Sequence, residues 1–339
     1  MADRDALIKA FLDTHGWQQA GRHILADDAS FRRYDRLTSA NGSAVLMDAP
    51  PPKEDVRPFV SIARHLVNLG LNAPEILAIN EQHGFLLLED FGDNTFTRVL
   101  KTSPERETDL YASAVDVLID LHRKPEVDIL SCPLMPYDTE KLIDEARLLI
   151  DWYLPAITGA GISADLAQEY CEIWRDVFTL LENQPQTLVL RDYHVDNLVW
   201  LDSGGTGLLD FQDALFGPAV YDVVSLLEDA RRDIDETLID KMQDRYTHAF
   251  PALAKSGPAR DAFDQAYAIM GAGRHAKVIG IFTRLCVRDA KPGYLMHIPR
   301  VWSLLEKSLH HPVLAPVQTW IDEHIPETKR GIPLDPAVT

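Results

Sequence analysis

The sequence predicts an α+β fold, with a small β-rich N-terminal part and a large, mainly helical C-terminal part. Short extended runs dominate up to about residue 92, and long stretches with apolar residues at three- and four-residue spacing dominate after it. A short strand-rich interruption, 187–211, lies within the helical part. The chain has 339 residues, which is long enough for two packed domains. We therefore expect domains at 1–92 and 93–339.

The elements can be assigned from the period of the apolar residues. In the N-terminal part we expect helices over 4–15 and 56–69, and strands over 31–37, 43–48, 76–79 and 85–89. The dipeptide Asn41-Gly42 is typical of the turn of a hairpin. In the C-terminal part we expect helices over 106–122, 138–152 and 163–184, and helix again after the interruption to near residue 325.

The composition limits the partners and the compartment. The formal net charge is −19 and the isoelectric point is about 5.0. Because an acidic surface repels nucleic acid and anionic lipid, we expect neither nucleic acid nor a membrane as partner. We also expect no obligate protein partner. Cys132, Cys171 and Cys286 lie far apart, which favours buried thiols over a disulfide framework or a zinc site. The charged N-terminus lacks the apolar run of a signal peptide, so we expect a cytoplasmic protein.

The segment from Thr187 to Asp213 contains the candidate catalytic and metal-binding residues. An apolar strand ends at Asp192, a short loop leads to Asn197 and a second strand, and a turn returns the chain to Asp210. These three oxygen-bearing side chains are thereby expected to meet at the ends of strands. Such a set is what a hard cation such as Mg²⁺ binds.

The spacing of these residues matches a site of phosphoryl transfer. That reaction needs metal ions on the phosphates and one carboxylate that orients and deprotonates the attacking hydroxyl. The offset from Asp192 to Asn197 is that of the Asp-x-x-x-x-Asn of kinase catalytic loops. Asp210-Phe211 lies where kinases have the metal-binding Asp-Phe-Gly, with Gln212 in place of the glycine. The order of a β-rich part and a helical part is also that of the two-lobed, protein-kinase-like fold.

These residues resemble the aminoglycoside phosphotransferase family, which is related to choline and homoserine kinases. The catalytic loop of that family reads His-Gly-Asp-x-His-x-x-Asn, and residues 190–197 read Leu-Arg-Asp-Tyr-His-Val-Asp-Asn. Leu-Arg thus replaces His-Gly. The resemblance implies that Asp192 is the catalytic base and that Asn197 and Asp210, the latter in the motif 210–213, hold Mg²⁺.

The resemblance also implies roles for neighbouring residues. His194 is either a metal ligand or a brace of the loop. Asp222, in the helix that begins near Ala219, would support the backbone of the catalytic loop. Asp196 and Asp213 either contact the substrate or are solvated charges of the loop.

By the same resemblance, ATP would lie between the two lobes. Its adenine would bond to the backbone of Glu89 and Phe91 in a hinge over 89–92. The loop that covers the phosphates should precede the strand at Phe31, where the sequence has no glycine-rich pattern. The residues expected to bind the phosphates there are Ser30, Phe31, Arg32 and Arg33.

A lysine that the kinase fold normally uses is missing. The strand over 44–48, which should carry a lysine for the α- and β-phosphates, has none, and the helix over 56–69 offers no obvious glutamate to pair with it. Either Arg32, Arg33 or Lys53 supplies the charge, or the chain binds nucleotide poorly.

Longer strings extend the resemblance to one subgroup of bacterial sugar kinases. They are DASFRRY, VLMDAPP, LLLEDFGD, LLDFQDALFGPAVYD and KVIGIFTRL. The subgroup phosphorylates the anomeric hydroxyl of N-acetylmuramate and N-acetylglucosamine in cell-wall recycling. The resemblance therefore implies an enzyme that uses ATP and Mg²⁺ and forms a sugar 1-phosphate. The candidates for binding the sugar on the helical lobe are Asp213, Glu228, Asp229, Arg232, Arg274 and His275.

Three other functions stay open at this point. An aminoglycoside or choline kinase could use Trp152 and Tyr153 to bind an amine. A nucleotide-binding pseudokinase agrees with the missing lysine but not with the intact Asp192, Asn197 and Asp210. A metal hydrolase built on His194, Asp196 and Asp210 would lack the HxH or HExxH spacing of zinc sites.

Overall fold

The computed structural model describes residues 4–27, 31–40 and 42–333. The chain forms two compact units. The first unit comprises the chain up to Pro133 together with Asp192–Ala214, and the second comprises Leu134–Arg191 and Leu215–Thr339. The domain boundary near residue 92, between a β-rich and a helical part, stays a prediction, because the compact units follow a different division of the chain.

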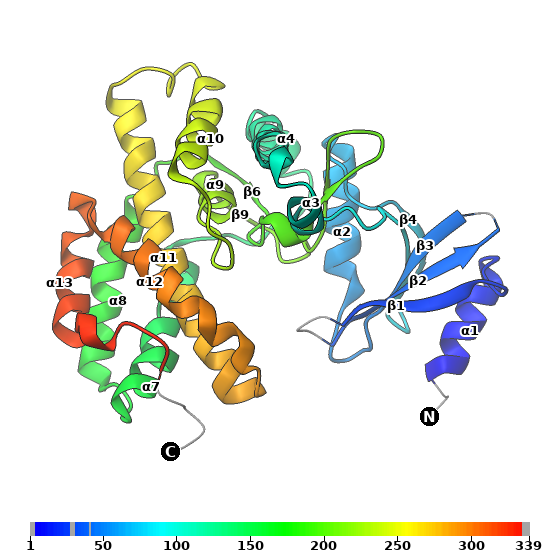
Figure 1. Ribbon diagram of the computed structural model, residues 1–339, viewed down its shortest axis with the longest axis horizontal. Helices are drawn as coiled ribbons and strands as arrows, with labels where there is room; N and C mark the ends of the chain where they lie inside the picture. Colours follow the sequence, from blue (N-terminus) through cyan, green and yellow to red (C-terminus); the bar gives the residue numbers. More distant parts are fainter. Residues whose placement is uncertain (1–3, 28–30, 41, 334–339) are drawn as a thin grey trace. The chain divides into compact units, whose positions relative to one another are not determined.

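A five-stranded antiparallel sheet forms the centre of the first unit, in the order β1-β2-β3-β5-β4 (Figure 1). Its strands are β1 (Gly21–Asp27), β2 (Arg33–Ser39), β3 (Gly42–Asp48), β4 (Ile76–Asn80) and β5 (Phe85–Glu89). The four predicted strands are confirmed, with shifts of one or two residues at their ends. Strand β1 had no prediction of its own, because exposed Ile24 and Leu25 at this edge of the sheet hide any period of burial. The predicted turn includes Asn41, which lies outside the described residues.

Two predicted helices of the first unit are confirmed as α1 (Arg4–Thr14) and α2 (Val56–Asn68). Helix α1 buries Ile8, Phe11 and Leu12 against a face of the sheet that includes Leu37, Leu46 and Phe85. Helix α2 lies on the opposite side of the sheet (Figure 1). Asp55 caps α2 by accepting a hydrogen bond of 2.9 Å from the amide of Arg57. The sheet is therefore covered by a helix on each side.

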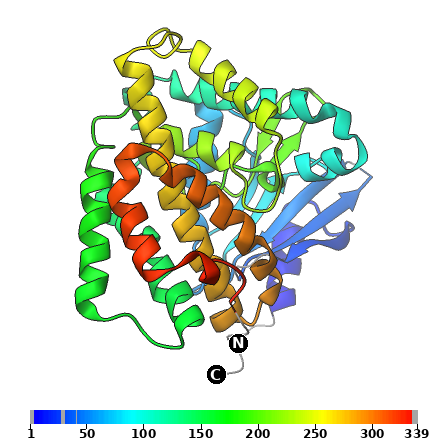
Figure 2. The same ribbon diagram turned by 60° about the vertical axis from the view of Figure 1, so that its left-hand side comes forward.

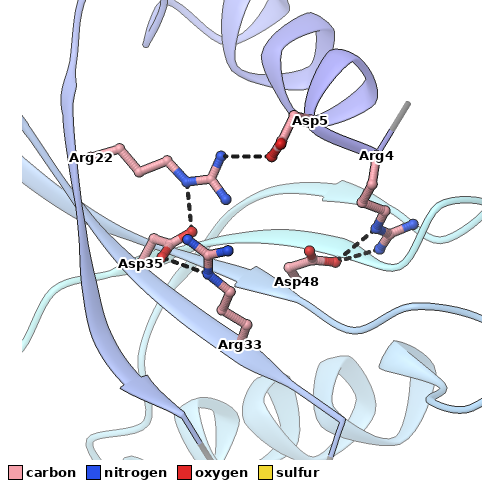
Figure 3. Close-up of polar contacts among 6 residues, drawn as sticks. All are labelled: Arg4, Asp5, Arg22, Arg33, Asp35 and Asp48. Atoms are coloured by element: carbon pink, nitrogen blue, oxygen red, sulfur yellow. Dashed lines mark hydrogen bonds and ion pairs between the residues drawn. The ribbon is translucent and has the colours of Figure 1, made fainter. Parts of the chain in front are cut away.

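Charged side chains link the sheet to α1 (Figure 3). The side chain of Asp35 on β2 has no exposed surface, and its two oxygens accept hydrogen bonds from Arg22 Nε at 2.6 Å and Arg33 Nε at 3.0 Å. Arg4 of α1 pairs with Asp48 at the end of β3. Because an ionised carboxylate is costly to bury unless cations surround it, the two arginines explain how β2 carries a charge inside the fold.

The remaining elements of the first unit come from two distant parts of the sequence. They are α3 (Phe96–Thr102), η1 (Pro104–Arg106), α4 (Glu107–His122), α5 (Glu126–Ile129), η3 (Val195–Asn197), β7 (Leu198–Trp200) and β8 (Thr206–Leu208). Strands β7 and β8 form an antiparallel hairpin. A Cβ atom on Gly207 would lie 2.8 Å from the ring of Phe91, so the glycine lets the segment after β5 pack directly on this hairpin.

The second unit is mainly helical. Its elements are α6 (Thr139–Ala146), η2 (Leu149–Tyr153), α7 (Leu154–Thr158), α8 (Ala164–Thr179), β6 (Gln186–Val189), β9 (Leu215–Pro218), α9 (Val220–Leu227), α10 (Glu236–His248), α11 (Pro258–Asp289), η4 (Pro292–His297), α12 (Ile298–Leu309), η5 (Pro312–Leu314), α13 (Ala315–His324) and η6 (Glu327–Lys329). The helix predicted over 138–152 is correct for α6 but ends in a π-helical turn, η2. Strand β6 pairs with β9, which had not been predicted. No helix in the described part of the chain combines the length and the apolar character that crossing a membrane requires.

Helices α8, α11, α12 and α13 lie side by side in the second unit (Figure 2). Aromatic rings fill the space between α8 and α13, where the Tyr170 and Trp320 centroids are 4.7 Å apart. Trp174 and Phe178 stack on each other, also at 4.7 Å. A Cβ on Gly280 of α11 would lie 2.3 Å from the carbonyl of Leu148, so this helix approaches the chain before η2 at backbone distance. These contacts make a core on which polar groups can be held rigidly.

Candidate active site

Asp192, Asn197 and Asp210 lie together in the first unit. The side-chain amide of Asn197 donates a hydrogen bond of 2.9 Å to the carbonyl oxygen of Asp192, and the same nitrogen lies 3.4 Å from Asp210 Oδ2. The amide of Leu209 donates to the carbonyl of Asn197 at 2.9 Å, which joins the end of β8 to the end of η3. Asp192 is exposed. The structure thus brings the three residues into one hydrogen-bonded set, while their roles stay predictions.

Asp210 has a backbone conformation that requires support. Its φ is 56°, in the left-handed region that residues other than glycine rarely occupy. Gln212 Nε2 donates to Asp210 Oδ1 at 2.8 Å, and Gln212 is the residue that replaces the usual glycine. The buried ring of Phe211 packs on Phe59 of α2, with centroids 4.9 Å apart. These contacts fix the carboxylate of Asp210 and tie it to α2.

Asn197 and Asp210 form a donor set that fits a magnesium ion. The amide nitrogen of Asn197 is engaged with the carbonyl of Asp192, which leaves its amide oxygen for a cation. Among the described residues no group of three or more His, Cys, Asp and Glu side chains is arranged to hold a metal. Mg²⁺ usually binds through one or two carboxylates and the phosphates of the substrate, so a sparse set of this kind suits an ion that arrives with a nucleotide.

The loop from Tyr193 to Asn197 is held by side chains of the first unit. The hydroxyl of Tyr193 donates to the carbonyl of Ala114 at 2.8 Å, and Thr97 donates from its hydroxyl to Asp196. His194 is buried, and its Nδ1 lies 4.0 Å from Asp196 Oδ2. Both Asp196 and His194 therefore have partners within the loop and its surroundings.

In the second unit, Asp222 of α9 holds the backbone just before Asp192. Asp222 is fully buried, and its two oxygens accept hydrogen bonds from the amides of Leu190 at 2.6 Å and Arg191 at 2.9 Å. Ser225 donates to the carbonyl of Arg191 at 3.1 Å. One helix therefore binds three consecutive peptide groups at this point of the chain.

The hinge expected over 89–92 begins at Glu89, the last residue of β5, and continues beyond the strand. The amide of Glu89 donates to the carbonyl of Glu75 at 2.8 Å, so an adenine at this segment would have to use other backbone groups. Arg36 of β2 binds Asp90 and Asp93 at 2.8 and 2.9 Å. The hydrogen bond from Arg36 is the main reason that the pKa of Asp93 lies below its ordinary value. The contact of adenine with Glu89 and Phe91 stays a prediction.

The two arginines expected near the phosphates have different partners. Arg32 Nε lies 3.4 Å from Glu54 Oε2, and the other oxygen of Glu54 accepts a hydrogen bond of 3.0 Å from the amide of Phe31. Arg33 is bound to buried Asp35 (Figure 3). Ser30 lies outside the described residues. Glu54, which stands just before the cap of α2, was not predicted, because an acidic partner was expected inside the helix over 56–69.

The candidates for binding the sugar do not form one set. Asp213 is exposed in the first unit, and Arg232 is half-buried in the second. Glu228, Asp229, Arg274 and His275 are buried in the second unit. Arg274 donates to the carbonyl of Glu228 at 3.3 Å, and His275 Nε2 lies 3.3 Å from Glu228 Oε2.

Burial changes the pKa values of Glu228 and His275. It raises the pKa of Glu228 to about 7, and hydrogen bonding to Tyr267 and the charges of Lys307 and Arg274 only partly oppose it. Burial, together with Arg274, lowers the pKa of His275 well below its ordinary value, so this ring is neutral at neutral pH. The contact between Glu228 and His275 is therefore not an ion pair.

A second buried polar group in the second unit had no prediction. Glu145 of α6 accepts hydrogen bonds from Arg191 and from the hydroxyl of Tyr137, and it forms an ion pair of 2.9 Å with Lys277 of α11. The only signal in the sequence was one lysine within the otherwise apolar stretch around 276–282. A single charge on a helix does not reveal its tertiary partner.

Comparison with known proteins gives matches over most of the chain. Residues 22–261 match the phosphotransferase enzyme family. A Pseudomonas aeruginosa protein named N-acetylmuramate/N-acetylglucosamine kinase is 39% identical over 320 residues, which cover 92% of this chain and 91% of that protein. A Caulobacter vibrioides protein of the same name is 32% identical and covers 97% of this chain and 99% of that protein. The resemblance stated from the sequence is confirmed.

Solved structures show the same fold. A choline/ethanolamine kinase family protein from Mesorhizobium loti matches with a TM-score of 0.61 at 13% identity, over 95% of this chain and all of that one. Aminoglycoside 2′-phosphotransferase-IIIa matches with a TM-score of 0.61 at 14% identity, over 90% of this chain and 98% of that one. At these identities the likeness concerns the fold alone. The predicted α+β, protein-kinase-like fold is confirmed.

Proposed function

The chain belongs to the phosphotransferase enzyme family, and on this premise we propose that it phosphorylates the anomeric hydroxyl of N-acetylmuramate and N-acetylglucosamine. ATP is the co-substrate, with a divalent metal that we propose to be Mg²⁺. The product would be a sugar 1-phosphate for cell-wall recycling, formed in the cytoplasm. The observation that carries the proposal is the hydrogen-bonded set of Asp192, Asn197 and Asp210 at the spacing of a kinase catalytic loop.

Asp192 is the proposed catalytic base. Its carboxylate is exposed. It orients the anomeric hydroxyl and accepts its proton as the oxygen attacks the γ-phosphorus and the bond to the leaving ADP breaks. The carbonyl of the same residue is bound by Asn197, which couples the position of the base to that of the metal donors. Asn197 and Asp210 would hold Mg²⁺, which offsets the negative charge on the transferring phosphoryl group.

Arg32 is the proposed replacement for the missing strand lysine. In kinases that lysine is held by a glutamate of the following helix, and both must be in place for transfer. Here Glu54, which directly precedes the cap of α2, lies 3.4 Å from Arg32, whose side chain is only 12% exposed. Helix α2 in turn carries Phe59, which packs on Phe211 beside Asp210. Arg33 is committed to Asp35, so Arg32 is the better candidate for the α- and β-phosphates.

The sugar would bind on the helical lobe. Of the six candidates, exposed Asp213 and half-buried Arg232 can reach a ligand without rearrangement. An arginine would also suit the carboxylate of the lactyl group of N-acetylmuramate. Buried Glu228 and His275 would instead support the residues that contact the sugar.

Release of ADP from MgATP, with N-acetylmuramate, N-acetylglucosamine, choline and kanamycin as separate acceptors, tests the proposal. We expect turnover with the two sugars and at most background hydrolysis with choline and kanamycin. Turnover with choline or kanamycin alone would replace the sugar assignment with an amine-bearing substrate. Failure of the chain to bind MgATP at all would contradict the kinase proposal and favour a pseudokinase.

A further inference from the structure

The backbone of Arg191 has a conformation that its side chain does not favour. Its φ is 69°, in the left-handed region where a Cβ atom is strained and glycine is not. The related catalytic loops described above have glycine at this position. The chain therefore carries an arginine where the local geometry favours glycine, and such strain persists only where surrounding contacts hold it.

Contacts within the second unit hold this residue at both ends of its backbone. Asp222 accepts a hydrogen bond from the Arg191 amide at 2.9 Å, and Ser225 donates one to its carbonyl at 3.1 Å. Both partners belong to α9, and Asp222 and Ser225 are fully buried. The direction in which the chain leaves Arg191 toward Asp192 is thereby restricted.

The side chain of Arg191 enters a buried network. Its guanidinium binds Glu145 of α6 and lies 5.7 Å from the centroid of the Tyr137 ring. Lys277 of α11 binds the other oxygen of Glu145 at 2.9 Å and donates to the hydroxyl of Tyr221 at 3.2 Å. The side chains of Glu145, Lys277 and Arg191 are 10%, 11% and 18% exposed. Two cations and the hydroxyl of Tyr137 thus contact the carboxylate of Glu145.

Glu145 is ionised at neutral pH. Burial alone would raise the pKa of Glu145, but the charges of Lys277 and Arg191 outweigh it, so this pKa lies below its ordinary value. Removing one partner would leave a buried charge with less compensation. The ion pair with Glu145 therefore holds the guanidinium of Arg191 in place.

We propose that Arg191 is a positioning residue for phosphoryl transfer, which fixes the peptide that leads into Asp192 by anchoring its own side chain to Glu145. This role rests on the proposed function of Asp192. Helices α6, α9 and α11 all contribute, through Glu145, through Asp222 and Ser225, and through Lys277. A glycine would adopt the same φ without strain but would have no side chain to bind Glu145. The arginine strains the backbone, but its contact with Glu145 fixes the direction of the chain.

The variant Arg191→Gly separates this role from simple tolerance of a strained residue. It relieves the strain, so a tolerated arginine would give unchanged or higher activity. We expect instead that kcat falls about 30-fold, with the KM values for MgATP and sugar within about threefold of wild type, because a misdirected base affects the chemical step more than binding. More ADP should form per sugar phosphate, since water competes when the acceptor hydroxyl is poorly oriented.

Three further measurements make the kinetic test specific. Glu145→Gln should reproduce much of the loss of kcat. The kcat of the double variant should be at most about threefold lower than that of the less active single variant, because both substitutions remove the same contact. Millimolar guanidinium should restore part of the activity of Arg191→Gly. The control Arg147→Gln removes a surface pair with Asp151, 3.3 Å long, and should leave kcat unchanged. Additive losses, or a kcat of Arg191→Gly within about twofold of wild type, would overturn the proposal.

Amide hydrogen exchange of residues 190–197 tests the inference independently of turnover. Exchange in this peptide should be faster in Arg191→Gly than in wild type, while exchange in α8 should be the same in both. Unchanged exchange in 190–197 would overturn the inference even if the enzyme is a sugar kinase. Conversely, if wild type phosphorylates no sugar, the proposed function fails, and the exchange result still decides whether Arg191 fixes this segment.

Discussion

The polar group around Asp210 in the first unit and the one around Glu145 in the second unit differ in how their carboxylates are held. In the first unit, Asp210 accepts hydrogen bonds from amide groups of Asn197 and Gln212, and Asp192 is exposed. In the second unit, Glu145 is buried beneath Arg191 and Lys277. Amides orient a carboxylate without neutralising it, whereas an ion pair uses its charge within the protein.

This difference separates groups that can act on a ligand from groups that support them. A carboxylate held by amides keeps its charge for a metal ion or a proton, as phosphoryl transfer requires. A carboxylate between two cations is suited to fixing helices and loops. The predictions below test this division, beginning with the residue on which the chemistry depends most.

The largest effect is expected for Asp192→Asn. Loss of the proposed base should lower kcat by about 10³-fold, with a small change in the KM for MgATP, because general base catalysis contributes on the order of 10²- to 10⁴-fold. The melting temperature should stay that of wild type, because the side chain is exposed. Asp202→Asn, in the exposed turn after β7, is the matched control and should be fully active. Equal kinetics for the Asp192 variant and wild type would remove Asp192 from the mechanism.

The next effect is expected for Asp210→Asn. The variant keeps the shape of the side chain but loses its charge and one of its two acceptor oxygens, so kcat at a fixed Mg²⁺ concentration should fall about 10²-fold. The Mg²⁺ concentration that gives half-maximal activity should rise. Titration of activity with MgCl₂ after treatment with EDTA measures both. Activity that survives EDTA without added metal would contradict the metal assignment.

A smaller effect distinguishes Arg32 from Arg33. We expect Arg32→Ala to raise the KM for MgATP about tenfold, because a charge-assisted contact to phosphate is lost. Arg33→Ala removes one partner of buried Asp35 and should lower stability with a change in KM of less than about threefold. Steady-state kinetics and thermal melting of both variants give the comparison. Equal effects on KM would mean that neither arginine specifically replaces the lysine.

These assignments show which parts of the site a sequence can predict. Asp192, Asn197 and Asp210 could be located because short offsets between two strands bring them together, so local geometry is sufficient. Glu54 was missed because it precedes α2, whereas an acidic partner was expected within the helix itself. Strand β9 was missed because Gly217 and Pro218 disfavour a strand, and its pairing with β6 compensates for them.

The buried charges were the least predictable part. Glu228 and Arg274 were named as candidates for contacting the sugar, and both are buried. Glu145 and Lys277 meet only because α6 and α11 pack together, which no local pattern records. Whether a charged residue faces solvent or a partner depends on tertiary packing, and a helical period without an alignment does not determine it.

The smallest effect concerns Glu228 and the pH dependence of stability. Because the folded protein holds this proton up to a pKa of about 7, the stabilisation is fully present below the ordinary pKa near 4.5 and is lost as the pH rises through 7. Its full size is about 3 kcal/mol, from a shift of about 2.5 units. Glu228→Gln mimics the protonated form, so its melting temperature should fall less than that of wild type between pH 5 and pH 8. If the melting temperatures of Glu228→Gln and wild type changed equally between pH 5 and pH 8, Glu228 would not be held protonated.

Phosphorus NMR of the product formed from N-acetylmuramate and MgATP tests the central claim most directly. The proposed reaction predicts a new phosphomonoester resonance coupled to the anomeric proton of the sugar, formed together with ADP and absent with Asp192→Asn. A phosphate coupled to other protons of the sugar would contradict the anomeric assignment. Consumption of ATP that yields only inorganic phosphate would contradict the sugar kinase itself.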